Sequence, residues 1–544
     1  MRTRLSAAIM AAALLIIVLA LVACGGGVPD AESPVIAATS PATPLPQPSA
    51  TIAPTDTAEP SPAPSPTPTH TPTPTPTPEP VTLAAPPEWE PDVRLALEAM
   101  NESGASPYAW SLLVEEDIEA ALAGGRAQIA LSRDDSGAIV RREPLAFAVP
   151  FTTEWENLLP AEAENVLANG HYLIRVIRWS DMTPDNKAMR VDGRHPTDPD
   201  YPYMETWSLM SASGYEEATA ELAGVLAEAL APLPTIRIAA VGDLNLDRSV
   251  GYIITTTGDL AYPLSLVKPV FDAADYTIGN LETALGDVGE PAAKLYPFRS
   301  PPQAAKALAI GGVDLVSLAN NHAQDYGPEA LLQGIDLLQA AGVATVGGGA
   351  NEAAAHAPHI AEIGGLKVAF LGYVNVPVEA ETHFDTRSWS ATADVPGLAW
   401  GDPARMSADV AAIRSDVDLV VVILHSGFEY IEEPGEEQVA AARAAIDAGA
   451  DLVVGHHAHI LQGIHHYGEG IIAYGMGNFL FDIDGPRETA ILNVWLDRNG
   501  VRQLELVPAI IQEHGQPRLA QPEEAGSILS RVYYLTMLLN AANP

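Results

Sequence analysis

The sequence predicts an α/β protein with parallel strand pairs. From about residue 235 to 513, apolar runs typical of strands alternate with amphipathic helical patterns. Within this range, segments 304–322, 406–427 and 437–459 share one order: a helical stretch, an aspartate, an apolar strand and then a histidine. This repetition indicates helix–strand units that place their polar residues at the ends of strands.

The chain begins with a pattern typical of secreted bacterial lipoproteins. Arg2 and Arg4 precede an apolar stretch of roughly 18 residues that ends at Cys24. The tetrapeptide Leu-Val-Ala-Cys resembles a lipobox, so residues 1–24 are expected to be a signal peptide whose final cysteine is lipidated. The alternative is an uncleaved membrane anchor. Both alternatives place the rest of the chain outside the cytoplasm, attached to the cell membrane.

Residues 25–86 are rich in proline, threonine and serine and contain few large apolar side chains. Such a segment cannot form a core, so we predict an extended linker. At about 3.1 Å per residue in polyproline II, it would hold the folded parts on the order of 100 Å from the bilayer.

The overall charge restricts the partners. Lys and Arg number 28 against 69 Asp and Glu, which gives a net charge of −41. A surface this acidic repels phosphate backbones, so we expect no nucleic-acid partner. The single cysteine also excludes an intramolecular disulfide framework.

Residues 87–232 are predicted to form a smaller α/β domain. Strand patterns occur at 127–131, 144–151 and 171–179, and a helix is expected at 216–231. The order of these elements resembles part of the type-2 periplasmic substrate-binding fold. An accessory domain without a ligand is the alternative. Residues 514–544 are expected to be a C-terminal extension with a helix.

Polar residues follow several predicted strands of region 235–513. In parallel α/β sheets, side chains just past the carboxyl ends of strands converge on one crevice. Isolated histidines such as His356, His359 and His383 are expected to be structural. The strand-end residues, in contrast, form a candidate site: Asp243, Asn245, Asn280, Glu282, Asn321, His322, His425, His457 and His459.

Carboxylate, amide and imidazole groups together suit one or two divalent ions such as Mn²⁺, Fe²⁺ or Zn²⁺, with Mg²⁺ as a further candidate. Two ions that share a carboxylate would stabilise both oxygens of a phosphoryl displacement. Alternate residues of an extended chain share a face. We therefore expect His457 and His459 to point together and His456 to point away.

Six ordered motifs extend over about 280 residues: GDLNLDR, GNLETAL, SLANNHAQDYG, HSGFEY, GHHAH and YGMGNFLFD. They resemble the CapA family of capsule or poly-γ-glutamate synthesis proteins, within the calcineurin-like metallophosphoesterase superfamily. The resemblance implies a four-layer sandwich of two mixed sheets flanked by helices. It implies that the metal ligands are Asp243, Glu282, Asn321, His425, His457 and His459.

The resemblance also assigns roles beside the metal. His322 would be the acid or transition-state partner. Arg299 would contact an anion, or else be a surface ion-pair residue, and Asn245 and Asn280 are candidate substrate contacts. Independently of the resemblance, Glu429 could orient a ligand histidine or act as a base, with a solvated loop carboxylate as the alternative. The wider superfamily has a histidine at the position of Asn245 and an aspartate where this chain has Asn280 or Glu282, which puts a second metal ion in doubt.

Two functions are compatible with the sequence. The first is a lipid-anchored, extracytoplasmic metal-dependent hydrolase or transferase that acts on an anionic surface polymer, poly-γ-glutamate or polysaccharide, alone or with its synthase complex. The second is a non-catalytic surface scaffold with a degenerate metal site.

Overall fold

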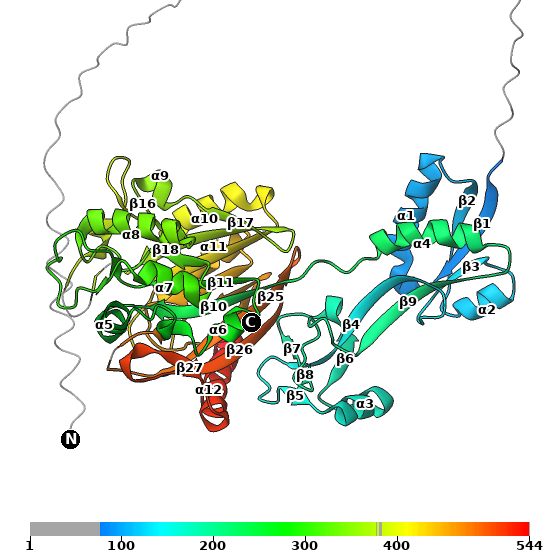
Figure 1. Ribbon diagram of the computed structural model, residues 1–544. Coiled ribbons are helices and arrows are strands. Elements are labelled where there is room, and N and C mark those ends of the chain that lie inside the picture. The colour runs from blue at the N-terminus through cyan, green and yellow to red at the C-terminus, as the bar shows by residue number, and fades with distance from the viewer. Residues whose placement is uncertain (1–76, 377, 380–382, 483, 543–544) are drawn as a thin grey trace, which may run out of the picture. The chain divides into compact units, whose positions relative to one another are not determined.

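The computed structural model describes residues 77–376, 378–379, 383–482 and 484–542 (Figure 1). The predicted signal peptide, Cys24 and most of the predicted linker lie outside these residues. Among the residues described, no helix is both long enough and apolar enough to cross a membrane.

The first folded region is a mixed sheet with the strand order β2-β1-β3-β9-β4-β6, and β7 also pairs with β4. The same region contains four helices, α1, α2, α3 and α4 (Figure 1). The strands are β1 (Glu79–Ala85), β2 (Tyr108–Val114), β3 (Ile129–Ser132), β4 (Ala138–Pro150), β6 (Arg175–Arg178), β7 (Asn186–Ala188) and β9 (Met204–Ser211), with a separate pair β5 (Asn157–Leu158) and β8 (Arg190–Val191). The helices are α1 (Glu90–Ser103), α2 (Ile118–Ala123), α3 (Pro160–Asn169) and α4 (Glu216–Ala229).

The strands and the helix expected at 127–131, 144–151, 171–179 and 216–231 correspond to β3, β4, β6 and α4. Strand β1 corrects the predicted linker, because it lies inside the range 25–86. Val81 and Leu83 on this strand are fully buried and join a core with Ile129 and Leu131 of β3. Two apolar side chains at alternate positions are enough to attach this short stretch to the sheet.

A network of charged side chains is buried in this first region. The Arg141 guanidinium lies 2.5 Å from Glu143, and both side chains are less than one-tenth exposed. Ser180 donates to the other oxygen of Glu143 at 3.2 Å, and Arg178 lies 3.6 Å from the same oxygen. Both oxygens of Glu143 therefore have partners within the protein.

The second region contains two large mixed sheets. One has the order β15-β14-β11-β10-β25-β26-β27, and β24 pairs with β10; the other has the order β17-β18-β20-β21-β23-β22. The first sheet consists of β10 (Ile236–Leu244), β11 (Tyr276–Leu281), β14 (Leu315–Ser317), β15 (Ala344–Val346), β24 (Asn478–Leu480), β25 (Glu488–Asp497), β26 (Gly500–Ile511) and β27 (Pro517–Leu519). The second consists of β17 (His359–Ile363), β18 (Leu366–Asn375), β20 (Leu419–Ser426), β21 (Leu452–His456), β22 (Ile464–Tyr467) and β23 (Gly470–Ala473).

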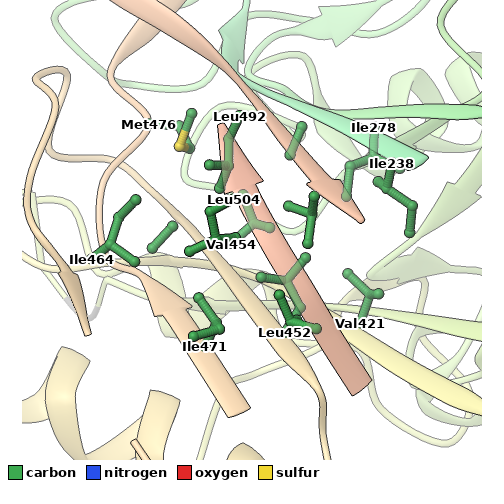
Figure 2. Close-up of a cluster of buried hydrophobic side chains, with 14 of the residues drawn as sticks. Ile238, Ile278, Val421, Leu452, Val454, Ile464, Ile471, Met476, Leu492 and Leu504 are labelled. Atoms are coloured by element: carbon green, nitrogen blue, oxygen red, sulfur yellow. The ribbon is translucent and has the colours of Figure 1, made fainter. Parts of the chain in front are cut away.

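The two sheets share one hydrophobic core, shown in Figure 2. Ile238 and Leu492 from the first sheet join the same buried cluster as Val421 and Leu452 from the second. Strand β20 is buried along its whole length, as expected for a valine-rich central strand of a parallel sheet.

Helices pack on the other faces of both sheets. The helices are α5 (Arg248–Thr257), α6 (Lys268–Phe271), α7 (Ala304–Gly311), α8 (Gly327–Ala341), α9 (Glu352–Ala355), α10 (Pro403–Ile413), α11 (Glu436–Asp447) and α12 (Pro522–Ala542). Side chains of α5, α7 and α8 pack against β10 and β14, and those of α10 and α11 pack against β20 and β21. The region is therefore mixed α/β, with two sheets packed together and flanked by helices. Helix α12, in the predicted C-terminal extension, differs from the other helices, because its Ile528 and Val532 lie in the core that the two sheets share.

The three repeated helix–strand units appear as α7–β14, α10–β20 and α11–β21. They do not belong to one sheet, however. Strand β14 lies in the first sheet, whereas β20 and β21 lie in the second. The predicted convergence at one sheet edge is therefore corrected, because strand ends of two packed sheets bring their residues to the same place.

Candidate metal centre

Strand register brings the polar strand-end residues together. Asp243 at the end of β10 pairs with Asn280 on β11 and with Asn478 on β24. In the second sheet, β20 and β21 pair so that His425 lies opposite His456. The last residues of these strands thus face one buried volume.

Glu282, His457 and His459 form the centre of the site. Each offers one ligand atom, and these atoms all lie within 4.8 Å of one another. Two further predicted ligands border this triangle. The Oδ2 atom of Asp243 is 3.5 Å from Nδ1 of His459, and Nε2 of His425 is 3.5 Å from Oε1 of Glu282.

The hydrogen bonds show whether these residues fit a metal ion. Both carboxylate oxygens of Glu282, the Oδ2 of Asp243 and the Nδ1 of His457 are buried and accept no hydrogen bond. Leaving buried carboxylate oxygens without a partner is costly. A divalent ion that prefers oxygen and imidazole nitrogen ligands would satisfy all of these atoms, so the residues present fit such an ion.

Burial and mutual repulsion set the charges of the site. Burial, together with the negative charge of Asp243, raises the pKa of Glu282 well above its usual range. Burial also raises the pKa of Asp243, but the hydrogen bond from His456 and the nearby His459 imidazole hold it well below the usual range. Burial, helped by the charge of His459, lowers the pKa of His457 to about 3. A neutral imidazole at His457 is the form that binds metals.

His322 lies beside this centre and is held by charged groups. Its Nδ1 is 2.6 Å from Oδ2 of Asp325, and Nζ of Lys294 lies 2.8 Å from the other oxygen of Asp325. Lys294 is itself buried and also pairs with Glu379 at 2.5 Å. Because Nδ1 faces Asp325, Nε2 of His322 is the nitrogen left for chemistry.

Several predicted ligands and contacts are engaged with other protein groups. Both ring nitrogens of His425 have partners, Asn321 at 2.8 Å and Asn280 at 3.2 Å. The amide of Asn280 also donates to Asp243 at 2.8 Å. Asn280, Asn321 and His425 therefore frame the triangle in this structure.

Both polar atoms of the Asn245 amide form hydrogen bonds within the protein. It donates to the carbonyl oxygen of Glu282 at 3.0 Å and accepts from the backbone N–H of Asp247 at 2.9 Å. Asn245 thus fixes the backbone of Glu282, and these contacts weigh against its predicted role in substrate binding.

Two other predicted residues lie at the periphery. The Arg299 guanidinium lies 3.5 Å over the ring of Tyr326 and donates to the carbonyl oxygen of Gly289 at 3.0 Å. Glu429 is exposed on the loop after β20, close enough for its charge to act on Glu282 and His459. Its role as a base stays a prediction.

The expected division of the histidine triplet is confirmed for His457 and His459, which lie together at Glu282, but not for His456. His456 does not point away, because its Nδ1 lies 3.1 Å from Oδ1 of Asp243. The chain is not extended beyond His456, where β21 ends; His457 and His459 both have left-handed backbones, with φ of 83° and 57°. The turn, not strand alternation, brings these two imidazoles to Glu282.

Two residues beside His322 were not predicted, Asp325 and Lys294, which hold its ring. Asn478 has a supporting role, because it accepts at 2.8 Å from Nδ1 of His459. Asp325 follows His322 by three residues, a spacing that allows such a contact. Lys294 lies in a loop that carries no sequence signal.

Comparison with known proteins identifies the family. The model of bacterial capsule synthesis protein PGA_cap matches residues 237–483, which include the whole centre. The capsule biosynthesis protein CapA of Bacillus anthracis is 32% identical over 321 residues, covering 56% of this chain and 75% of the relative. The chain belongs to the CapA family.

Other CapA relatives agree. The PGA biosynthesis protein CapA of Bacillus subtilis is 30% identical over 278 residues, covering 50% of this chain and 71% of the relative. Among solved structures, a hypothetical protein from Thermus thermophilus covers 50% of this chain and 98% of its own length, at 15% identity and a TM-score of 0.32. A phosphate transporter substrate-binding protein from Clostridium perfringens covers 27% of this chain and 93% of its own length, at 11% identity and a TM-score of 0.22. The periplasmic-binding-like fold of the first region stays a prediction.

Proposed function

We propose that this CapA-family protein is a metal-dependent hydrolase or transferase that acts in the synthesis, anchoring or trimming of a capsular polymer. The observation that carries the proposal is the buried triangle of Glu282, His457 and His459, in which neither carboxylate oxygen of Glu282 accepts a hydrogen bond. The names of the relatives, which refer to capsule and poly-γ-glutamate biosynthesis, supply the polymer class.

The proposed chemistry divides between the ion and the chain. A divalent ion bound at the triangle would polarise an oxygen of the substrate and lower the pKa of a bound water. Glu282, His457 and His459 would hold it, and Asp243 would complete the shell. Asp325 accepts from Nδ1–H of His322 and orients the ring, so that the doubly protonated imidazolium can deliver its Nε2 proton to the leaving group and become neutral.

The fold is compatible with the metallophosphoesterase superfamily. A core between two sheets, with helices packed on the outer faces, corresponds to the four-layer sandwich that the family resemblance implies. We propose that this region has the four-layer sandwich of that superfamily.

We also propose that Cys24 carries a lipid that attaches the protein to the outer face of the cell membrane. The sequence pattern before Cys24 and the proline-rich linker support this proposal. Cys24→Ala should release the protein from the membrane fraction and abolish incorporation of labelled palmitate. Retention of both would contradict lipidation.

A scaffold without catalysis is the second candidate, and one observation favours it. Asn245 stands where the wider superfamily has a histidine, and both polar atoms of its amide bond to the backbone, which weighs against a second metal position. A single tightly held ion is compatible with hydrolysis, whereas no ion at all would favour the scaffold.

The test combines metal analysis with activity on phosphodiester and γ-glutamyl substrates in Mn²⁺. We expect His457→Ala to lose the ion and the activity, and His322→Ala to keep the ion and lose the activity. His359→Ala, a histidine on edge strand β17 whose ring lies 3.4 Å from Tyr276, serves as the control and should keep both. An active His457→Ala protein without metal would overturn the proposal.

A further inference from the structure

Arg248 is an exposed cation close to the candidate centre. It opens helix α5, four residues after the end of β10. In the part of the chain that the structure describes, no carboxylate lies within 4.0 Å of its guanidinium. Acidic residues outnumber Lys and Arg by 69 to 28 in this protein, so an arginine without an ion pair beside an acidic site is unexpected.

An aromatic contact places Arg248 next to His322. The guanidinium lies 5.0 Å over the ring of Phe298, and the ring centroids of Phe298 and His322 are 4.5 Å apart. The guanidinium and the imidazole are therefore no more than 9.5 Å apart. This is within the reach of a single substrate molecule.

The same aromatic side chain connects Arg248 to the metal ligands. Phe298 meets Phe481 edge-on at 5.7 Å, and Phe481 meets the ring of His459 at 5.9 Å. Phe298 and Phe481 are both buried, so they form a rigid wall beside Arg248, His322 and His459.

The guanidinium is oriented but not saturated. One nitrogen of Arg248 donates to the carbonyl oxygen of Asp482 at 3.0 Å, and the Asp482 carboxylate accepts from the backbone N–H of Ser249 at 3.1 Å. The guanidinium has five N–H donors, so several remain for a ligand. By contrast, Lys294 on the other side of His322 is paired with Asp325 and Glu379.

We propose that Arg248 binds an oxyanion of the substrate, a carboxylate or a phosphate, next to the group that reacts. The inference rests on the proposed function and specifies its substrate as anionic. It also explains how a protein of net charge −41 holds an anionic polymer. An unpaired guanidinium supplies a local attraction where the surrounding field is repulsive.

The test measures binding of two probes, inorganic phosphate and a γ-linked glutamate tetramer, by calorimetry with and without Mn²⁺. Arg248→Gln should weaken binding of at least one probe by about tenfold or more, and Arg248→Lys should recover part of it. Arg498→Gln is the matched control. Arg498 is an exposed arginine in the turn between β25 and β26, at the end of the sheet opposite Asp243, and its loss should change neither affinity.

The pattern of losses identifies the anion. An effect on the tetramer alone assigns a carboxylate, and an effect on phosphate alone assigns a phosphate. Equal affinities of wild-type and Arg248→Gln proteins for both probes, or no binding of either probe by the wild type, would overturn the inference. Metal content is measured on the same samples, so a failure of the metal proposal is seen separately from a failure of the Arg248 subsite.

Discussion

Both folded regions contain a buried carboxylate, but the two carboxylates differ in their hydrogen bonds. In the first region, Glu143 is 1% exposed and each of its oxygens has a partner, Arg141 for one and Ser180 for the other. In the second region, Glu282 is fully buried and neither of its oxygens accepts a hydrogen bond. Burial raises the pKa of both side chains.

The difference separates structural charges from functional ones. A buried charge that finds all of its partners inside the protein contributes to a particular fold. A buried charge without partners is retained at a cost, which indicates a ligand that supplies what is missing. Four substitutions test this distinction, from the largest expected effect to the smallest.

Breaking the paired network should have the largest effect. Arg141→Met leaves Glu143 buried without its closest cation, and we expect a loss of about 3–5 kcal/mol in the free energy of unfolding. Urea unfolding followed by circular dichroism measures it. The exposed pair of Arg94 and Glu90 provides the control, since Arg94→Met should cost less than about 1 kcal/mol. Equal losses in the two variants would contradict the structural role of the Arg141 network.

Substitution of Glu282 should affect metal binding rather than the stability of the fold. Glu282→Gln should weaken Mn²⁺ binding at least about 100-fold, because a carboxylate ligand is lost. It should leave the metal-free protein about as stable as the wild type, because a buried carboxyl group whose oxygens accept no hydrogen bond is replaced by an amide of the same shape. Metal titration and thermal unfolding with a chelator measure the two effects. Glu143 is equally buried and provides the control. Glu143→Gln should destabilise the protein and leave its metal affinity unchanged.

The residue that supports a ligand should matter less than the ligand itself. Asn478→Ala removes the acceptor of His459 Nδ1, and we expect metal affinity to fall about tenfold. Asn499→Ala, in the turn after β25, is the comparison and should not change it. An unchanged affinity in Asn478→Ala would show that the turn alone orients His459.

Asp134, a carboxylate of the first region that is hydrogen-bonded by nearby serines, should make the free energy of unfolding depend slightly on pH. Hydrogen bonds from Ser132 and Ser136 lower the pKa of Asp134 to about 2. A lowered folded pKa stabilises the protein above the unfolded value of 3.8, and this contribution disappears as the pH falls toward 2. Asp134→Asn should therefore cost about 1 kcal/mol at pH 6, after allowance for partial exposure, and nothing near pH 2. Unfolding at both pH values, with Asp135→Asn as control, measures the difference.

The sequence predicted the elements of the fold better than their assembly. Long apolar runs such as β10 and β20 and the repeated helix–strand units were visible, because periodicity and composition are local properties. The assignment of β14 and β20 to different sheets was not visible in the repeats, because pairing depends on contacts between distant segments. Strand β1 was missed because only two of its side chains, Val81 and Leu83, differ from the linker composition.

The candidate site shows the same limit. The types of these residues and their positions at the ends of strands predicted that Glu282, His457 and His459 belong to one cluster, as the structure shows. The contact between His456 and Asp243 could not be derived from the sequence. It depends on a left-handed turn that begins one residue after His456. Lys294 could not be found either, since only the folded chain places a loop lysine against Asp325.

Those left-handed turns affect how the protein can be improved. Arg248, Tyr430, His457 and His459 all have positive φ, a conformation that glycine adopts without strain and other residues adopt at a cost of about 1 kcal/mol or more. A laboratory screen that rewards heat resistance alone should therefore enrich glycine at these positions. Such variants would be more heat-stable but would lack the side chains of the site. Thermostable variants of this protein therefore have to be selected for ligand binding as well.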